Sequence, residues 1–179
     1  ASKDPQLQRV QSADFRAIVT DGLELYEREE RELNVLLFQE VLDNIARVDR
    51  TLSKRGGSLL LVGRSGVGRR TATSLVAHMH GMVFQSLDIT DEFGQKSLHI
   101  QLKNVLQLAG VENEQVVFYV EDHHIAVLSD VLETVNSLLS SGEVPGLYTH
   151  EELEPLLSPL RELMMQDGNF RTPYDFFQY

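Results

Sequence analysis

Apolar residues near the start of the chain recur at steps of three and four, the spacing of one face of an α-helix. They are Leu33, Leu37, Val41, Ile45, Val48 and Leu52. The region therefore predicts helical structure. Just before this stripe, five glutamates between positions 24 and 32 are mixed with arginines. We interpret the acidic run as the solvated face of a helix, and an acidic docking surface is the alternative.

The pattern changes after Gly56–Gly57, because short apolar runs now alternate with longer periodic segments. Three runs predict strands, at Ser58–Val62, Met82–Leu87 and Gln115–Val120. Four segments predict helices, at Arg69–His80, Glu92–Leu108, Ala126–Leu139 and Glu151–Met165, the last disturbed by Pro155 and Pro159. This alternation is typical of an α/β fold, a parallel sheet flanked by helices. Residues 1–55 would be helices that lead into this α/β part, residues 56–179.

Composition narrows the class of protein. The 179 residues are 42% hydrophobic and 24% charged, which is ordinary for a globular domain. The net charge of −11 argues against a nucleic-acid partner. No apolar run approaches the roughly 20 residues of a membrane span, so no membrane partner is expected. The chain has no cysteine, which excludes disulfides and thiolate metal sites.

The candidate chemistry is concentrated in a glycine-rich loop between the first predicted strand and the next helix. Gly63 and Gly68 have the spacing of the P-loop pattern G-x-x-x-x-G-K-[ST], in which backbone N–H groups hold phosphate. The candidate binding residues are Gly63, Arg64, Ser65, Gly66, Val67, Gly68, Arg69, Arg70 and Thr71. The alternative is a glycine-rich turn without a ligand.

Two residues of the loop differ from the pattern. Arg69 takes the place of the lysine, and Arg70 takes the place of the hydroxyl residue. A guanidinium binds phosphate oxygens, so Arg69 can still serve the first role. Arg70 cannot ligate Mg²⁺, and Thr71 is turned by about 100° around the helix and cannot replace it. We expect the Arg70 side chain to point outward into solvent, which leaves the cation without this ligand.

A second motif follows the third predicted strand, where Glu121 and Asp122 come after Val116–Val120. P-loop enzymes carry an aspartate and then a glutamate here, one for the metal and one for the attacking water. In this chain the order is reversed. Glu121 would hold Mg²⁺ through water, and Asp122 would be a catalytic base that is one methylene short. Because a misplacement of about 1 Å can slow a reaction about a hundredfold, we expect a degenerate pair. A strand-end cap is the alternative for Asp122.

The histidines are weaker candidates. His123 and His124 follow the acids, but neighbouring residues of an extended segment point in opposite directions and would not share an ion. His78 and His80 lie two apart on a predicted helix and do not share a face. We interpret all four as surface or supporting residues.

Three stretches resemble the fourth AAA+ module of dynein heavy chains. Residues 38–50 resemble the helix before the P-loop, the loop 63–71 follows at the expected distance, and residues 136–148 are similar to the signature NxLLxxGEVPxLF. Within this family, the loop GRSGVGRRT and the segment SGEVPGLY look most like the cytoplasmic dynein 2 class, the motors of intraflagellar transport. The resemblance covers nearly the whole chain and implies a P-loop NTPase fold of the AAA+ type.

The resemblance also implies a function. The chain would be one module of a six-module ring, with ATP or ADP bound at residues 63–71 and Mg²⁺ and water near Glu121 and Asp122. Its partners would be the neighbouring AAA+ modules of the same heavy chain, microtubules through the whole motor, and dynein accessory chains. The location would be the cytoplasm, the cytoskeleton and the cilium.

The departures from the family pattern change what we expect of this module. Arg70 and the reversed acids favour a regulatory module that binds nucleotide with little or no hydrolysis. The alternatives are an active P-loop ATPase module and a purely structural ring module with an empty loop.

The sheet of this family implies one more expectation. It places a fourth strand, with a polar sensor residue, between the P-loop strand and the strand that ends in acids. The chain ends at Phe176–Tyr179, about where that strand would begin. We therefore expect Leu59–Val62 to have no pairing partner in these residues, and the sensor, the helical lid and any arginine finger to be absent.

Overall fold

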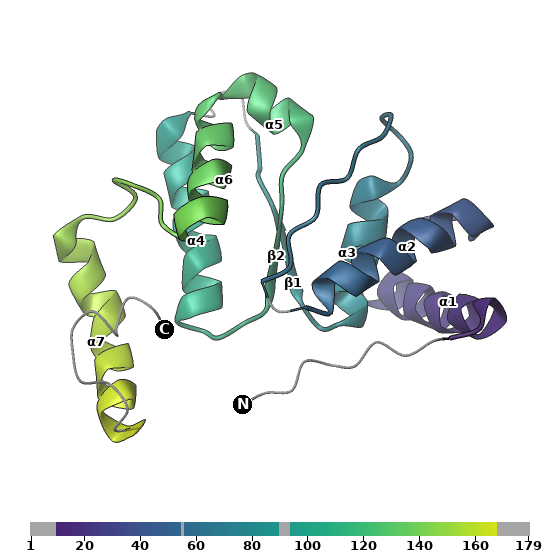
Figure 1. The fold of residues 1–179 in the computed structure, drawn as a ribbon, viewed down its shortest axis with the longest axis horizontal. Helices are drawn as coiled ribbons and strands as arrows, with labels where there is room; N and C mark the ends of the chain where they lie inside the picture. Colours follow the sequence, from purple (N-terminus) through teal and green to yellow (C-terminus); the bar gives the residue numbers. More distant parts are fainter. Residues whose placement is uncertain (1–9, 55, 90–93, 168–179) are drawn as a thin grey trace. The chain divides into compact units, whose positions relative to one another are not determined.

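A computed structural model describes residues 10–54, 56–89 and 94–167 of the chain (Figure 1). These residues form two compact units. The first comprises the described residues up to Ser86 together with Gln115–Tyr119. The second comprises those from Leu87 to Glu114 and from Val120 onward. No helix in the described part of the chain is both long and apolar enough to cross a membrane.

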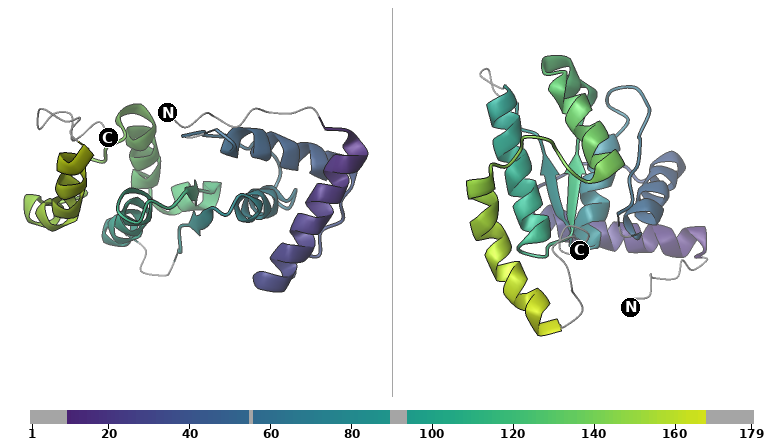
Figure 2. Two further views of the ribbon diagram at one scale, coloured as in Figure 1. Left: turned by 90° about the horizontal axis from the view of Figure 1, so that it is seen from below. Right: turned by 60° about the vertical axis from the view of Figure 1, so that its left-hand side comes forward.

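The first unit is built around α3 (Arg69–Met79), against which α1 (Ser12–Glu29) and α2 (Gln39–Leu52) both pack (Figures 1 and 2). Its core consists of Val19, Leu23, Tyr26, Leu42, Ile45, Val48, Ala72, Leu75 and Val76. Burial of one such leucine, isoleucine or valine side chain contributes about 1.5–3 kcal/mol, so this cluster is the main source of stability of the unit. The predicted helix Arg69–His80 is confirmed.

The α2 helix begins later than the apolar spacing predicted. Leu33 and Leu37 lie in an irregular segment before Gln39, although both still pack against the core. The backbone of Asn34 has a left-handed conformation with φ of 51°, which is incompatible with a helix. The Glu27 carboxylate accepts the N–H groups of Leu33 and Asn34 at 2.9 and 3.2 Å, so these donors are satisfied without a helix.

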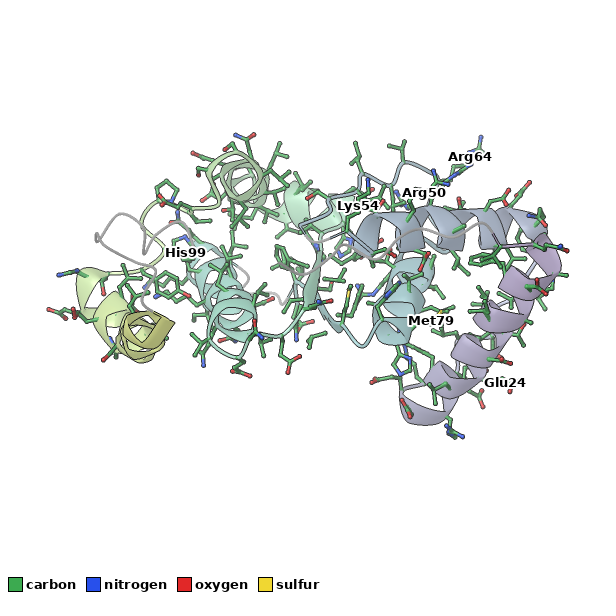
Figure 3. All side chains as sticks on the ribbon, turned by 60° about the horizontal axis from the view of Figure 1, so that its bottom comes forward. Glu24, Arg50, Lys54, Arg64, Met79 and His99 are labelled. Atoms are coloured by element: carbon green, nitrogen blue, oxygen red, sulfur yellow. The ribbon has the colours of Figure 1, made fainter. Side chains whose placement is uncertain are left out.

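The glutamates between positions 24 and 32 have different environments in the structure. Glu24 is exposed on α1 (Figure 3), and so is Glu29, as expected of a solvated face. Glu27 is half-buried because of its bonds to the following segment. Glu30 and Glu32 lie beyond the end of α1 and are exposed.

Small residues and histidines fix α3 against its two neighbours. A Cβ atom at Gly22 of α1 would lie 2.8 Å from the Cγ of Met79, which α3 directs towards α1 (Figure 3). At the same end of α3, His78 Nε2 lies 3.0 Å from Glu29 Oε2, and His80 Nε2 lies 2.8 Å from Asp49 Oδ1. The two histidines thus bond to different helices, in agreement with the prediction that they do not share a face.

The sheet of the first unit pairs β1 (Val83–Ser86) with β2 (Val116–Tyr119) in parallel, and α3 packs against β1. Val83 is opposite Val116, and Ser86 is opposite Tyr119. Both strands were predicted, with bounds one residue longer at each end.

The predicted strand Ser58–Val62 is wrong. The segment has no regular structure, and Leu60 and Val62 are 85% and 88% exposed. A strand needs a neighbour that satisfies its N–H and C=O groups. Among the described residues the sheet consists of β1 and β2 alone, and the segment pairs with neither. The expectation that Leu59–Val62 lacks a partner here is therefore confirmed, whereas Phe176–Tyr179 lies outside the described residues.

The second unit contains α4 (Gln95–Gly110), α5 (Asp122–Val127), α6 (Asp130–Ser141) and α7 (His150–Asp167). The helix predicted at Glu92–Leu108 is confirmed as α4, although Glu92 itself lies outside the described residues. The single helix predicted at Ala126–Leu139 is wrong, because Leu128 is extended and separates α5 from α6. Gly142 ends α6 with a φ of 74°, and α7 continues past both proline positions.

A side-chain cluster joins α4 to the first turn of α7 and to Tyr148 just before it. Lys103 Nζ lies 2.7 Å from Glu152 Oε1 and 5.2 Å from the centre of the Tyr148 ring. The Tyr148 hydroxyl donates to the Lys103 carbonyl at 3.4 Å. The hydrogen bond from Lys103, followed by that from the Thr149 N–H, lowers the pKa of Glu152. Burial, and then the charge of Glu152, raises the pKa of Tyr148.

We predict that Leu75→Ala lowers the free energy of unfolding of this chain by about 2–5 kcal/mol, because it leaves a cavity in the core. Leu75 is 1% exposed. The matched control is Leu60→Ala, which should change that free energy by no more than about 0.5 kcal/mol because Leu60 is exposed. Urea denaturation followed by circular dichroism measures both. Equal losses would contradict the surface position of Leu60.

We predict that the contribution of the Lys103–Glu152 pair to stability disappears in acid. The pKa of Glu152 is lower in the folded chain than in the unfolded one. The contribution is therefore complete above the ordinary range of a glutamate and is lost as the pH falls through the lowered value. Glu152→Gln should destabilise the chain at neutral pH and make little difference once the carboxylate is protonated. Urea denaturation over a pH series tests this, and a gap that does not change with pH would contradict it.

Candidate functional site

The loop Gly63–Gly68 leads directly into the first turn of α3. Gly66 and Gly68 have φ angles of 83° and 78°, which glycine adopts without strain. A Cβ atom at either position would meet nothing within 4 Å, so the backbone is open to approach. Gly68 precedes α3, and no side chain caps this end of the helix. Open N–H groups at a helix start, together with the helix dipole, fit a phosphate.

Arg69 bends back over the segment before the loop. Its Nη1 donates to the Leu61 carbonyl at 3.3 Å, and its side chain is half-buried. Arg64, Ser65 and Val67 are exposed in the loop, and Thr71 is half-buried in α3.

Arg70 is exposed, as predicted, but its side chain lies against the sheet and does not extend freely into solvent. Its Nη1 donates to Ser86 Oγ at 3.1 Å. Its guanidinium carbon lies 5.7 Å from the centre of the Phe84 ring and 6.0 Å from that of Tyr119. The face of an aromatic ring attracts a cation by about 0.5–1 kcal/mol at an exposed site, so the two rings favour this position of the guanidinium. Arg70 therefore joins the start of α3 to the sheet.

The contacts of Arg70 lie at one end of the strand pair. Ser86 and Tyr119 are the last residues of β1 and β2 and are paired with each other. The carboxyl ends of parallel strands are where open α/β sheets bind ligands. The positive charge of Arg70 therefore lies at the carboxyl end of this sheet.

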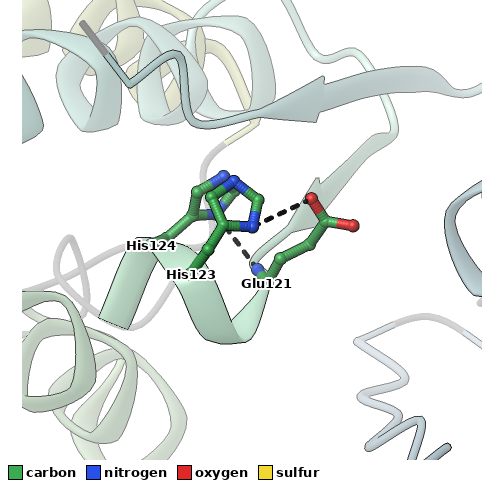
Figure 4. Close-up of side chains that lie close together, drawn as sticks. All are labelled: Glu121, His123 and His124. Atoms are coloured by element: carbon green, nitrogen blue, oxygen red, sulfur yellow. Dashed lines mark hydrogen bonds and ion pairs between the residues drawn. The ribbon is translucent and has the colours of Figure 1, made fainter. Parts of the chain in front are cut away.

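The two predicted acids belong to the second unit, whereas the loop belongs to the first. Glu121 directly precedes α5, and Asp122 is the first residue of that helix and is exposed. Glu121 Oε2 lies 3.5 Å from His123 Nδ1 (Figure 4). The cap position at this helix start is therefore occupied by Glu121 and not by Asp122.

One interpretation of the following histidines is wrong. His123 and His124 lie in α5, not in an extended segment, and their ring centres are 4.1 Å apart. His124 is 1% exposed, so of the two expected roles, surface or supporting residue, it has the supporting one. Its Nδ1 accepts the Glu121 N–H at 3.0 Å (Figure 4), so the ring satisfies a backbone donor at the start of α5.

This bond also decides whether the cluster can hold a metal ion. Candidate ligand atoms of Glu121, His123 and His124 all lie within 4.8 Å of one another. In a neutral imidazole, however, one nitrogen accepts and the other carries a proton. Because the Glu121 N–H occupies Nδ1 of His124, the other nitrogen of that ring carries the proton and cannot ligate. Two ligands remain, and the cluster is better explained as the cap of α5.

The start of α3 fits a phosphate but not the magnesium ion that normally accompanies it. In P-loop sites the residue at the position of Arg70 places a hydroxyl oxygen on Mg²⁺. A guanidinium offers five N–H donors and no lone pair. The phosphate-binding features of the loop are therefore present, whereas the hydroxyl ligand is replaced by a cation.

Comparison with known protein families agrees with this geometry. Residues 33–179 match the family described as the P-loop containing dynein motor region D4. The chain belongs to this dynein family. The resemblance and the P-loop fold class inferred from the motifs are thereby confirmed.

Individual dynein heavy chains are similar over most of the chain. It is 54% identical to cytoplasmic dynein 2 heavy chain 1 of Rattus norvegicus over 173 residues, 97% of this chain. It is 49% identical to that of Chlamydomonas reinhardtii over 168 residues, 92% of the chain. Identity to dynein axonemal heavy chain 6 of Homo sapiens is 32% over 151 residues, 82% of the chain. The chain spans about 4% of the length of these relatives.

We predict that His124→Ala lowers the free energy of unfolding of the D4 chain by about 1–3 kcal/mol, because the Glu121 N–H loses its acceptor. The adjacent His123→Ala is the control, since His123 is 58% exposed and should contribute no more than about 0.5 kcal/mol. Urea denaturation of both variants provides the comparison. A larger effect at His123 than at His124 would refute the capping role.

Proposed function

We propose that this chain is a regulatory nucleotide-binding module of a dynein motor, which holds ATP or ADP with little or no hydrolysis. One observation carries the proposal. The open glycine loop before α3 is retained, while the residue that should hold Mg²⁺ is an arginine bonded to Ser86. Such a module keeps the glycine loop that binds phosphate and lacks the hydroxyl ligand of Mg²⁺ that is needed for hydrolysis of ATP.

The binding half of the proposal rests on the loop and on the family. Gly66 and Gly68 provide an unobstructed backbone, and α3 contributes its uncapped N-terminus. Arg64 is exposed in the same loop and adds positive charge next to it. These features suit the phosphates of a nucleotide, which carry several negative charges.

The weak hydrolysis rests on three residues. Arg70 replaces the hydroxyl, and Glu121 and Asp122 have the reverse of the usual order. In our proposal Glu121 takes the metal position and Asp122 the base position, where its shorter side chain holds the attacking water poorly. A positioning error of about 1 Å is enough to lose about a hundredfold in rate.

The motor context rests on the relatives, several of which are named cytoplasmic dynein 2 heavy chain 1. We propose that the module belongs to a motor of this class. Its partners would be the neighbouring AAA+ modules, microtubules through the whole motor, and accessory chains. The motor would work on the cytoskeleton, in the cytoplasm and the cilium.

We predict that repair of the site restores hydrolysis. The variant Arg70→Thr, Glu121→Asp, Asp122→Glu, made in the intact heavy chain with its other nucleotide sites inactivated, should hydrolyse ATP at least about tenfold faster than the unrepaired chain. Nucleotide released from each denatured preparation measures occupancy, and phosphate release measures turnover.

The same preparations separate the alternatives. Bound nucleotide with slow turnover in the unrepaired chain supports the regulatory module. Equal and fast turnover in both would indicate an active ATPase. An unrepaired chain that retains no nucleotide, with its fold intact, would indicate a structural module with an empty loop.

A further inference from the structure

The position of Arg70 suggests more than the loss of a magnesium ligand. Arg70 is the second residue of α3, the place from which a P-loop hydroxyl reaches the ion. Its side chain extends from there to Ser86 and Tyr119, the final residues of β1 and β2. The guanidinium thus lies between the start of the phosphate-binding helix and the carboxyl ends of the strands.

The contacts fix this charge in place. Ser86 Oγ accepts from Nη1 at 3.1 Å, and the rings of Phe84 and Tyr119, 5.5 Å apart, both face the guanidinium. Arginine stays protonated at any physiological pH. A cation held by two strands and a helix is therefore a permanent part of the protein, unlike a metal ion that exchanges with solvent.

We propose that Arg70 supplies the positive charge that Mg²⁺ supplies in other P-loop sites, so that nucleotide binds to this module without a divalent cation. The proposal rests on the proposed nucleotide binding and adds how the phosphate charge is neutralised. A guanidinium binds phosphate oxygens through N–H groups and needs no water or carboxylate to complete a shell. It neutralises charge on the phosphates but cannot coordinate the β- and γ-phosphate oxygens as Mg²⁺ does, which is consistent with the slow turnover proposed above.

The alternative hypothesis, that Arg70 has a purely structural role, leads to a different prediction. If Arg70 only fastens α3 to the sheet, its removal alters the fold and does not change the dependence of binding on Mg²⁺. The distinguishing measurement is therefore the ratio of nucleotide binding with and without Mg²⁺, which a general loss of stability would not change.

The test uses the intact heavy chain and the photoreactive analogue 8-azido-ATP, with label at this module quantified from its own peptides. Each preparation is labelled with Mg²⁺ and with excess EDTA. In the unmodified chain the two labels should agree within about twofold. Label elsewhere in the same heavy chain is the internal control for folding.

Three variants isolate the charge. Arg70→Thr restores the hydroxyl, and its label should fall at least about tenfold in EDTA and recover with Mg²⁺. Arg70→Lys keeps the charge and should stay independent of Mg²⁺. Arg70→Ala has neither charge nor hydroxyl, and its label should fall in both conditions. The variant Ser86→Ala removes the hydrogen bond to Nη1 but leaves both rings, so its label in EDTA should fall less than that of Arg70→Ala.

The outcomes separate this proposal from the one on which it depends. No label at this module of the unmodified chain in either condition refutes nucleotide binding itself. Label that requires Mg²⁺ in the unmodified chain overturns the role of Arg70 and leaves nucleotide binding intact. Label of Arg70→Ala that stays at the unmodified level in EDTA also overturns it, because the charge would then be unnecessary.

Discussion

The burial of α3 is the constraint on which the first unit depends. Six consecutive residues of this helix, from Ala72 to Ala77, are buried, which happens only where neighbours cover the helix on more than one side. Here α1, α2 and β1 provide that cover. Because the axis of α3 is fixed in this way, its first turn and the loop before it have a defined direction. The geometry of the candidate phosphate-binding loop is therefore a consequence of core packing.

The first turn of α3 shows how one substitution can change the chemistry of a loop without changing its shape. The glycines keep their left-handed conformations, and the helix begins at the position that the motif requires. Arg70 replaces a short neutral side chain by a long charged one, and the sheet accommodates it between Phe84 and Tyr119. In the proposed site, the backbone would determine where an anion binds, and the side chain would determine which cation accompanies it.

Local patterns predicted most of the helices, both strands of the sheet and the loop. Local patterns did not predict the features that depend on residues distant in the sequence. The bend at Asn34 depends on the Glu27 carboxylate, and the break at Leu128 has no glycine or proline signal. The direction of Arg70 depends on residues 14 to 49 positions away in the sequence, which no spacing rule brings together. His124 gave no signal of burial, because its partner is a backbone N–H.

The exposed segment Leu59–Val62 has a consequence for aggregation. Its sequence is apolar and favours a strand, and its backbone groups pair with neither strand of the described sheet. Such a segment pairs readily with strands of other chains, which leads to aggregation. The stretch leading into the glycine loop therefore needs protection from such pairing. The residues just before the candidate binding loop are thus also the ones that favour aggregation.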